Sequence, residues 1–236
     1  MGIPITDTYI AVKNNTAGAL ISWFYTPNDI YTSGGQYMVK MINGYNLNKG
    51  TQHNWGTVSQ VVGIPIHTIW AEHWAKIFCF DTLRGERDRH QDNWGLIRPK
   101  NTELDDWTSY RFSPAFDNGT SLGYELDERR ILKTSKNIDA YILNKKAQHH
   151  MKWSLDDNKT YNHLDFMINF IRHYPEFKSI IDQSLNFDFD QFAKIVNHLT
   201  TLSVPCNLSK LRAEFMIELI LSRVLKLKEM LKREFD

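Results

Sequence analysis

The chain has 236 residues, 42% of them hydrophobic and 13% aromatic, so it is long enough to bury the core of one large domain or of two smaller lobes. Its 28 basic and 27 acidic residues almost cancel, which argues against the basic surface of a nucleic-acid or membrane-surface binder, and we expect no direct contact with either. The N-terminal sequence has no signal-peptide pattern and no apolar run approaches the ~20 residues of a membrane span, so we expect a cytoplasmic protein.

The N-terminal part of the chain has a strand-like pattern. The segments TYIAVK, ALISWFY and QYMVKM, at residues 8–13, 19–25 and 36–41, are rich in β-branched and aromatic residues. The turn-forming run NNTAG separates the first two segments. We therefore expect three strands, of which the first two form a hairpin.

From about residue 70 onward, helical periodicity replaces this pattern. Residues 98–113, which have a proline at or near each end, are expected to be an exposed connection or a hairpin. The adjacent pair His149-His150 is expected to be solvated, because neighbouring side chains on regular structure face different ways and make a poor metal pair. The apolar spacing predicts helices over residues 69–83, 161–174, 190–202 and 208–233.

The N-terminal hairpin and the lysine that follows it are compatible with nucleotide binding. Backbone N–H groups of the small-residue turn at 14–18, which includes Thr16 and Gly18, can approach phosphate oxygens, and Lys40 on the third strand can reach them as a point charge. An ordinary hairpin and a solvated lysine explain the same pattern. A second candidate turn, at 33–35, lies too near Lys40 to leave room for a full intervening strand, so we prefer the earlier one.

A polar stretch, GERDRHQDNWGLI at residues 85–97, lies between two apolar runs, where polar groups need partners. Asn93 follows Asp88 by five residues, and Asp117 follows Asp88 by 29 residues in the run FSPAFDNGTSLG. In phosphoryl transfer, a loop aspartate can accept a hydrogen bond from the incoming hydroxyl while an asparagine and a second aspartate bind the metal. Each of these residues alone is more typical of a cap or a turn, so the prediction depends on the three together.

The runs GERDRHQDNWGLI and SPAFDNGTSLGYEL resemble the signature of the HipA-like bacterial serine/threonine protein kinases, which are best known as components of toxin-antitoxin pairs. That family shows a D-R-H-x-x-N-W/F-G/S run followed by a Y/F-D-H/N-x-S/T-S-L run. The resemblance extends over residues 78–126, where the preceding FCFDTLRGERDRH is also similar to the family's approach to the loop. It is weak elsewhere in the chain.

The resemblance implies a role for each residue that matches the motif. It makes Asp88 the catalytic aspartate and Arg89 and His90 supporting residues of the loop, while Asn93 and Asp117 would be the metal ligands. Lys40 would contact the α- and β-phosphates of ATP, and Thr16 would be a site of autophosphorylation. The implied cofactors are ATP and Mg²⁺ or Mn²⁺.

The resemblance also implies an α+β, two-lobed protein-kinase-like fold, with a small β-rich lobe at residues 1–68 and a helical lobe at residues 69–236. The expected activity is transfer of the γ-phosphoryl group of ATP to serine or threonine hydroxyls of a protein substrate.

The sequence departs from the family pattern in two ways. No glutamate that could pair with Lys40 lies between the third strand and the first helix, and the nearest acid is Glu72, inside that helix. The N-terminal region is also short. The small lobe could therefore be completed by a partner, either an antitoxin or an accessory chain. A kinase of a non-protein acceptor and a pseudokinase or nucleotide-binding interaction module are the alternatives.

Overall fold

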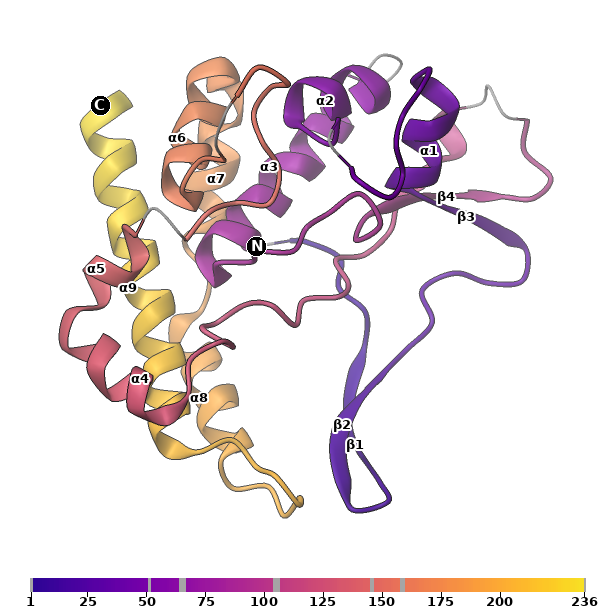
Figure 1. Ribbon diagram of the computed structural model, residues 1–236. Coiled ribbons are helices and arrows are strands. Elements are labelled where there is room, and N and C mark those ends of the chain that lie inside the picture. Colours follow the sequence, from indigo (N-terminus) through magenta and orange to yellow (C-terminus); the bar gives the residue numbers. More distant parts are fainter. Residues whose placement is uncertain are drawn as a thin grey trace.

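The computed structural model describes residues 2–50, 52–63, 67–103, 107–144, 147–157 and 160–235. A helical body makes up most of the molecule, and one β-hairpin extends from it (Figure 1). No helix of the described residues is long and apolar enough to cross a bilayer. The described elements are β1 (Thr8–Lys13), β2 (Thr16–Ile21), β3 (Asp29–Ser33), α1 (Gly34–Met41), α2 (Trp55–Gly63), α3 (His67–Arg84), β4 (Gly95–Pro99), η1 (Trp107–Ser109), β5 (Arg111–Phe112), α4 (Glu128–Thr134), η2 (Ser135–Asn137), α5 (Ile138–Ile142), α6 (His163–His173), η3 (Pro175–Phe177), α7 (Lys178–Ser184), α8 (Phe189–Leu199) and α9 (Lys210–Phe235).

Strands β1 and β2 form the expected N-terminal hairpin. Their antiparallel register pairs Lys13 with Thr16, so the turn consists of Asn14 and Asn15 alone. Both asparagines have positive φ, 52° and 59°, as a two-residue turn between twisted strands requires. The second strand therefore begins earlier than predicted and ends at Ile21 rather than at residue 25. No residue of either strand is buried.

The third predicted strand, at residues 36–41, is wrong, because this segment forms helix α1. Ser33 is the N-cap: its hydroxyl accepts a hydrogen bond from the Gln36 backbone N–H at 3.3 Å, and the Gln36 side-chain oxygen accepts one from the Ser33 N–H at 3.2 Å. This reciprocal capping box starts a helix, and it outweighs the β propensity of Tyr37 and Val39. Lys40 consequently lies in the last turn of a helix.

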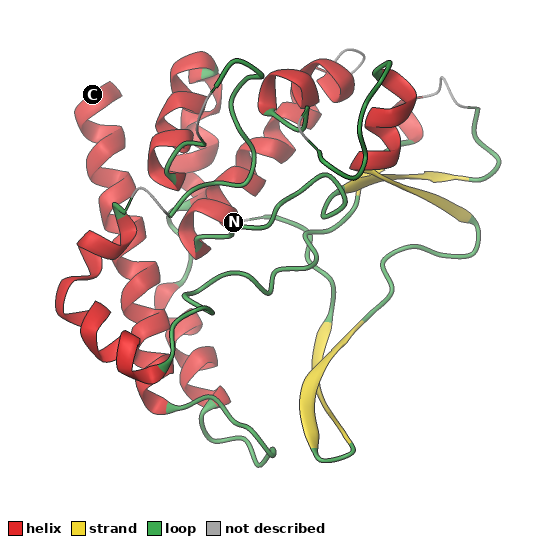
Figure 2. Cartoon of the chain, viewed as in Figure 1, coloured by secondary structure: helices red, strands yellow, loops and turns green. Residues whose placement is uncertain are grey.

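Strands β3, β4 and β5 form a separate antiparallel sheet (Figure 2). The pairing of β4 with β5 confirms the hairpin expected within residues 98–113; residues 104–106 lie outside the described residues. Strand β3 belongs to the predicted small lobe and pairs with β4, which belongs to the predicted helical lobe. The sheet thus crosses the predicted boundary at residue 68, and the division into lobes at that residue stays a prediction.

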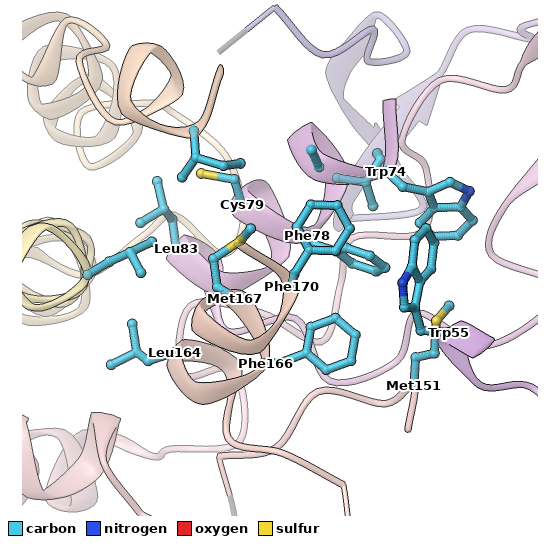
Figure 3. Packing of buried hydrophobic residues seen from close by; sticks show 14 of the residues in the cluster. Trp55, Trp74, Phe78, Cys79, Leu83, Met151, Leu164, Phe166, Met167 and Phe170 are labelled. Atoms are coloured by element: carbon cyan, nitrogen blue, oxygen red, sulfur yellow. The ribbon is translucent and has the colours of Figure 1, made fainter. Parts of the chain in front are cut away.

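The hydrophobic core lies mainly between α2, α3 and α6 (Figure 3). On α6, Phe166 and Phe170 are one helical turn apart, so both rings reach Phe78 of α3, at centroid distances of 4.9 and 5.4 Å. Trp55 of α2 packs against Phe78 from another direction, at 5.1 Å. The predicted helices α3, α6, α8 and α9 are confirmed, whereas α2, α4, α5 and α7 were not predicted. This packing fixes the end of α3, from which the polar loop begins.

We predict that the β1–β2 hairpin opens much more readily than the core, because a two-stranded hairpin with no buried residue is marginally stable. Hydrogen–deuterium exchange followed by mass spectrometry should show amides of β1 and β2 exchanging at least about 100-fold faster than those of α3. Slow exchange in the isolated chain, comparable to that of α3, would contradict this prediction.

Candidate active site

The polar loop begins where helix α3 ends. Gly85 follows the last helical residue with φ of +66°, the left-handed conformation that commonly terminates a helix. A Cβ atom at Gly85 would lie only 2.6 Å from Nη2 of Arg223, so a larger residue would displace that side chain. The loop then runs to Trp94, after which β4 begins.

Arg89 holds this loop from the inside of the molecule. Its side chain is 1% exposed, and its Nε and Nη2 donate to the two carboxylate oxygens of Asp81 on α3 at 3.0 and 2.8 Å. Nη1 donates to the backbone carbonyls of Asn93 and Phe116 at 3.1 and 3.0 Å, and Nη2 also donates to the Asn118 side chain at 3.0 Å. One guanidinium therefore joins α3, the loop and the turn around residue 117.

Asp81 and Arg89 form an ion pair that stays charged. Burial by itself raises the pKa of the fully buried Asp81 carboxyl, but the charge and hydrogen bonds of Arg89 outweigh this effect and hold that pKa below its ordinary value. Burial likewise acts to lower the pKa of Arg89, and Asp81 reverses this, so that the pKa of Arg89 is raised. A buried pair of this kind depends on both partners, because either charge alone would be uncompensated.

Glu86 is a second buried acid at the base of the loop. One of its carboxylate oxygens accepts the Asp88 backbone N–H at 3.0 Å and the hydroxyl of Thr120, and the other lies 3.2 Å from Nη2 of Arg84. The backbone at Asp88 is thereby fastened to the turn that follows Asp117. Sequence reasoning gave no role to Glu86 and named Asp81 only as part of the family's approach to the loop.

The structure brings the predicted catalytic Asp88 and the two predicted metal ligands, Asn93 and Asp117, to neighbouring positions around Arg89. The buried Asn93 donates from Nδ2 to the Asp88 backbone carbonyl at 2.7 Å, which leaves its amide oxygen available. Asp117 is exposed and has φ of +50°, a left-handed turn that aspartate tolerates better than most residues. Among the described residues, the carboxylates of Asp88 and Asp117 make no hydrogen bond or ion pair. They are free to bind a ligand.

The three residues predicted to bind the nucleotide lie elsewhere in the fold. Lys40 is exposed on α1 and has no ion-pair partner among the described residues, while Glu72 pairs with Lys76 at 2.6 Å. The strand on which the assignment of Lys40 depended is absent. Thr16 and Gly18 are exposed on β2 rather than in a turn. No described contact joins them to the loop, so their roles stay predictions.

The glycine-rich turn that sequence reasoning set aside contacts the loop directly. The Gly34 N–H donates to the Trp94 carbonyl at 2.8 Å, and the Gly35 N–H donates to the Gln91 carbonyl at 2.7 Å. These are two of the N–H groups that the first turn of a helix leaves without an intrahelical partner. A Cβ at Gly34 would be 2.1 Å from Cε2 of Trp94, so only glycine allows this approach. Trp94 is buried, so its ring holds this side of the loop in the core.

The histidines near the loop are neutral where they are buried. His149 is buried, contrary to the expected solvation, and its Nδ1 accepts the Met151 N–H at 3.1 Å. Burial lowers the pKa of His149 to about 4. His150 is exposed, as expected, and its ring lies 6.0 Å from that of His90. His90 accepts the Asp92 N–H at 3.2 Å, which is consistent with a supporting role inside the loop.

Comparison with known proteins supplies both a relative and a fold. No protein-family model matches the chain. A segment of 93 residues, 39% of the chain, is 34% identical to the serine/threonine-protein kinase CtkA of Helicobacter pylori strain J99, and this match spans 26% of that protein. The crystal structure of a Helicobacter pylori proinflammatory kinase CtkA matches with a TM-score of 0.75 at 21% identity, covering 100% of this chain and 80% of that chain.

These matches establish the fold and a similarity to one kinase. The chain has the fold of this kinase, which confirms the expected α+β class with a small β-rich lobe and a larger helical one. The sequence match covers about a quarter of the curated relative, and the structural match has low identity. The HipA-like assignment is not among these findings and stays a prediction.

We predict that Asp81→Asn costs about 3–5 kcal/mol of unfolding free energy, because it leaves the Arg89 guanidinium buried without its counter-ion. Urea unfolding followed by tryptophan fluorescence measures this loss. The matched control is Glu72→Gln, which removes the half-exposed pair with Lys76 and should cost less than about 1 kcal/mol. Equal losses in the two variants would show that the Asp81–Arg89 pair does not hold the fold together.

A second prediction concerns the contact of α1 with the loop. Gly34→Ala should cost roughly 1–3 kcal/mol, because the added methyl group overlaps the Trp94 ring. Gly18→Ala is the control: no atom lies within 4 Å of a Cβ at that position, and the change should stay within about 0.5 kcal/mol. Thermal and urea unfolding of the two variants test this difference, and an undiminished stability of Gly34→Ala would contradict the close approach.

Proposed function

We propose that the protein is an ATP-dependent kinase that transfers the γ-phosphoryl group to serine or threonine hydroxyls of a protein substrate in the cytoplasm. One observation carries the proposal: Arg89 gathers the loop of Asp88 and Asn93 and the turn of Asp117, while the two carboxylates remain unbonded. The similarity to a serine/threonine kinase supports it.

Each residue of this cluster has a proposed role. Asp88 orients the acceptor hydroxyl and accepts its hydrogen bond, while Glu86 fixes the Asp88 backbone. The amide oxygen of Asn93 and the carboxylate of Asp117 are the hard oxygen ligands that Mg²⁺ or Mn²⁺ prefers. No group of three histidine, cysteine, aspartate or glutamate side chains that could hold a metal occurs in the described ranges, so nucleotide and water oxygens would complete the coordination. A bound metal ion would neutralise phosphate charge.

An aromatic cluster beside Asp117 suits the base of the nucleotide. Phe116, the residue before Asp117, stacks on Phe24 at 5.1 Å, and Trp23 stacks on the same ring at 6.2 Å. The Trp23 side chain is 74% exposed, so its face is open to a planar ligand. We infer that a purine ring stacks on this cluster, since aromatic faces favour offset stacking. The phosphates would then point toward Asp117.

The remaining assignments are proposals that depend on the hairpin. We propose that Thr16 and Gly18 contact the phosphates, that Thr16 is autophosphorylated, and that Lys40 reaches the α- and β-phosphates after rearrangement of the small lobe. A partner chain, an antitoxin of a HipA-like pair or an accessory small-lobe subunit, would cover the hairpin. The exposed apolar side chains of Ile10 and Leu20 support such a partner.

We predict that Asp88→Ala and Asp117→Ala each lower phosphoryl transfer by about 100-fold or more, because each removes a group that orients the reactants. Incorporation of the γ-phosphate of radiolabelled ATP, with Mg²⁺ or Mn²⁺, measures the rate. Asp190→Ala serves as the control, since Asp190 is an exposed acid on α8. Equal incorporation in wild type and in both site variants would refute the proposed function.

A second candidate function is a nucleotide-binding pseudokinase, which the exposed Lys40, with no acidic partner among the described residues, favours. A rise in melting temperature with Mg²⁺-ATP that Asp117→Asn abolishes, without phosphoryl transfer to any protein, would support this alternative. Phosphoryl transfer to a lipid, a sugar or another small acceptor, and not to a protein, would support the alternative of a kinase with a non-protein substrate. The proposed roles of the site residues would then be unchanged.

A further inference from the structure

A cavity of about 240 Å³ borders the start of the candidate catalytic loop. It is lined by the loop itself, by α5 and α6, by α9 and by the segment before α4. Its lining residues include Gly85, Arg87, Glu125, Tyr141, His163 and Arg223. Arg87 directly precedes Asp88 in the chain, so the cavity adjoins the proposed acceptor site, while Asn93 and Asp117 are not among its described lining residues.

Arg223 is a buried cation that lacks a counter-ion. Its side chain, on α9, is 2% exposed and donates from Nη1 to the Thr82 carbonyl at 2.8 Å. Its Nε is buried with no partner, and no carboxylate of the described residues lies within ion-pair distance of its guanidinium. A buried guanidinium is costly unless it is paired and hydrogen-bonded. Glu125 and Tyr141 are near enough to favour the charge of Arg223 electrostatically, but neither is hydrogen-bonded to its guanidinium, which leaves it able to bind an anion in the cavity.

The other charges of the cavity do not supply this partner. Glu125 already accepts the Tyr141 hydroxyl at 2.9 Å and lies 3.5 Å from Nη1 of Arg87. His163 is fully buried, and burial lowers its pKa to about 3, so it carries no charge at neutral pH. Two guanidinium groups therefore face one carboxylate, and the described lining residues have a net charge of about +1 that a single anionic group would balance.

The size of the cavity limits the kind of anion. A volume of about 240 Å³ is below the roughly 300–1,000 Å³ of pockets that hold drug-sized ligands. One acidic side chain fits, whereas a nucleotide does not. Gly85 helps to leave this room, because a Cβ there would lie 2.6 Å from Nη2 of Arg223.

We propose that this cavity binds an acidic side chain, a carboxylate or a phosphorylated residue, of the peptide that carries the acceptor hydroxyl. Arg223 and Arg87 donate charge-assisted hydrogen bonds to the anion, and the peptide continues past Arg87 to place its hydroxyl at Asp88. The proposal deepens the proposed kinase function and rests on it for the identity of the acceptor. It predicts an acid-directed kinase.

Binding is measured first, by fluorescence anisotropy of labelled serine peptides that carry glutamate at positions neighbouring the serine, against the same peptides with glutamine. We expect wild type to bind the glutamate peptide about tenfold more tightly, the effect of one charge-assisted hydrogen bond. The Arg223→Met and Arg87→Gln variants should each bind the glutamate peptide and the glutamine peptide with nearly equal affinity. Arg129→Gln, which changes an exposed arginine of α4, should keep the difference.

A stability measurement separates a binding role of Arg223 from a structural one. Because the guanidinium lacks a counter-ion, Arg223→Met should melt at the same temperature as wild type or higher in the absence of peptide. The glutamate peptide should raise the melting temperature of wild type and leave that of Arg223→Met unchanged. A lower melting temperature for Arg223→Met, together with equal affinity of wild type for the two peptides, would overturn the proposal.

Further arms of the experiment identify the source of the anion and separate this proposal from the kinase function. If inorganic phosphate stabilises wild type but not Arg223→Met, and the two peptides do not differ, then the cavity takes a free anion and the peptide assignment is wrong. Preferential binding of the glutamate peptide without phosphoryl transfer would refute the kinase function and leave the cavity as an acidic-peptide site. Transfer with no preference between the peptides would overturn the cavity proposal alone.

Discussion

The buried guanidinium of Arg89 is the group on which the candidate active site depends. An arginine side chain has five N–H donors, and all five are used here, two toward the Asp81 carboxylate and three toward Asn93, Phe116 and Asn118. Because every donor is hydrogen-bonded, these bonds offset the desolvation free energy of the buried charge. The same contacts hold together the loop at Asn93 and the turn at Phe116, which are 23 residues apart in the sequence.

The loop is also held from its other side, by the first turn of α1. Gly34 and Gly35 give their N–H groups to the carbonyls of Trp94 and Gln91, and Glu86 fixes the backbone of Asp88. These supports act through the backbone and through side chains that are not proposed to react. The carboxylates of Asp88 and Asp117 therefore keep their hydrogen-bonding capacity, which is the arrangement that a preorganised site requires.

Sequence patterns predict the parts of the candidate site that lie close together in the chain. They do not predict the parts that depend on burial and on contacts between distant segments. Asp88 and Asn93 share one loop, so their spacing was enough to predict that they lie together. The importance of Asp81 and Glu86 was missed, because it depends on burial and on partners such as Thr120, 34 residues from Glu86. The strand predicted to carry Lys40 is wrong for a different reason: residues 36–41 have strand propensity, but the capping box of Ser33 starts a helix.

Arg89 and Arg223, two buried arginines near this loop, differ in how many of their N–H donors have a partner, and this difference indicates different roles. Arg89 has a carboxylate partner and a hydrogen bond for every donor, so its burial is explained by the structure that it holds together. Arg223 is equally buried, yet among the described residues only the Thr82 carbonyl accepts from it and its Nε has no partner. If stability alone determined position 223, an apolar side chain of similar volume would serve as well or better. A buried charge without a partner, beside an open cavity, therefore points to a ligand.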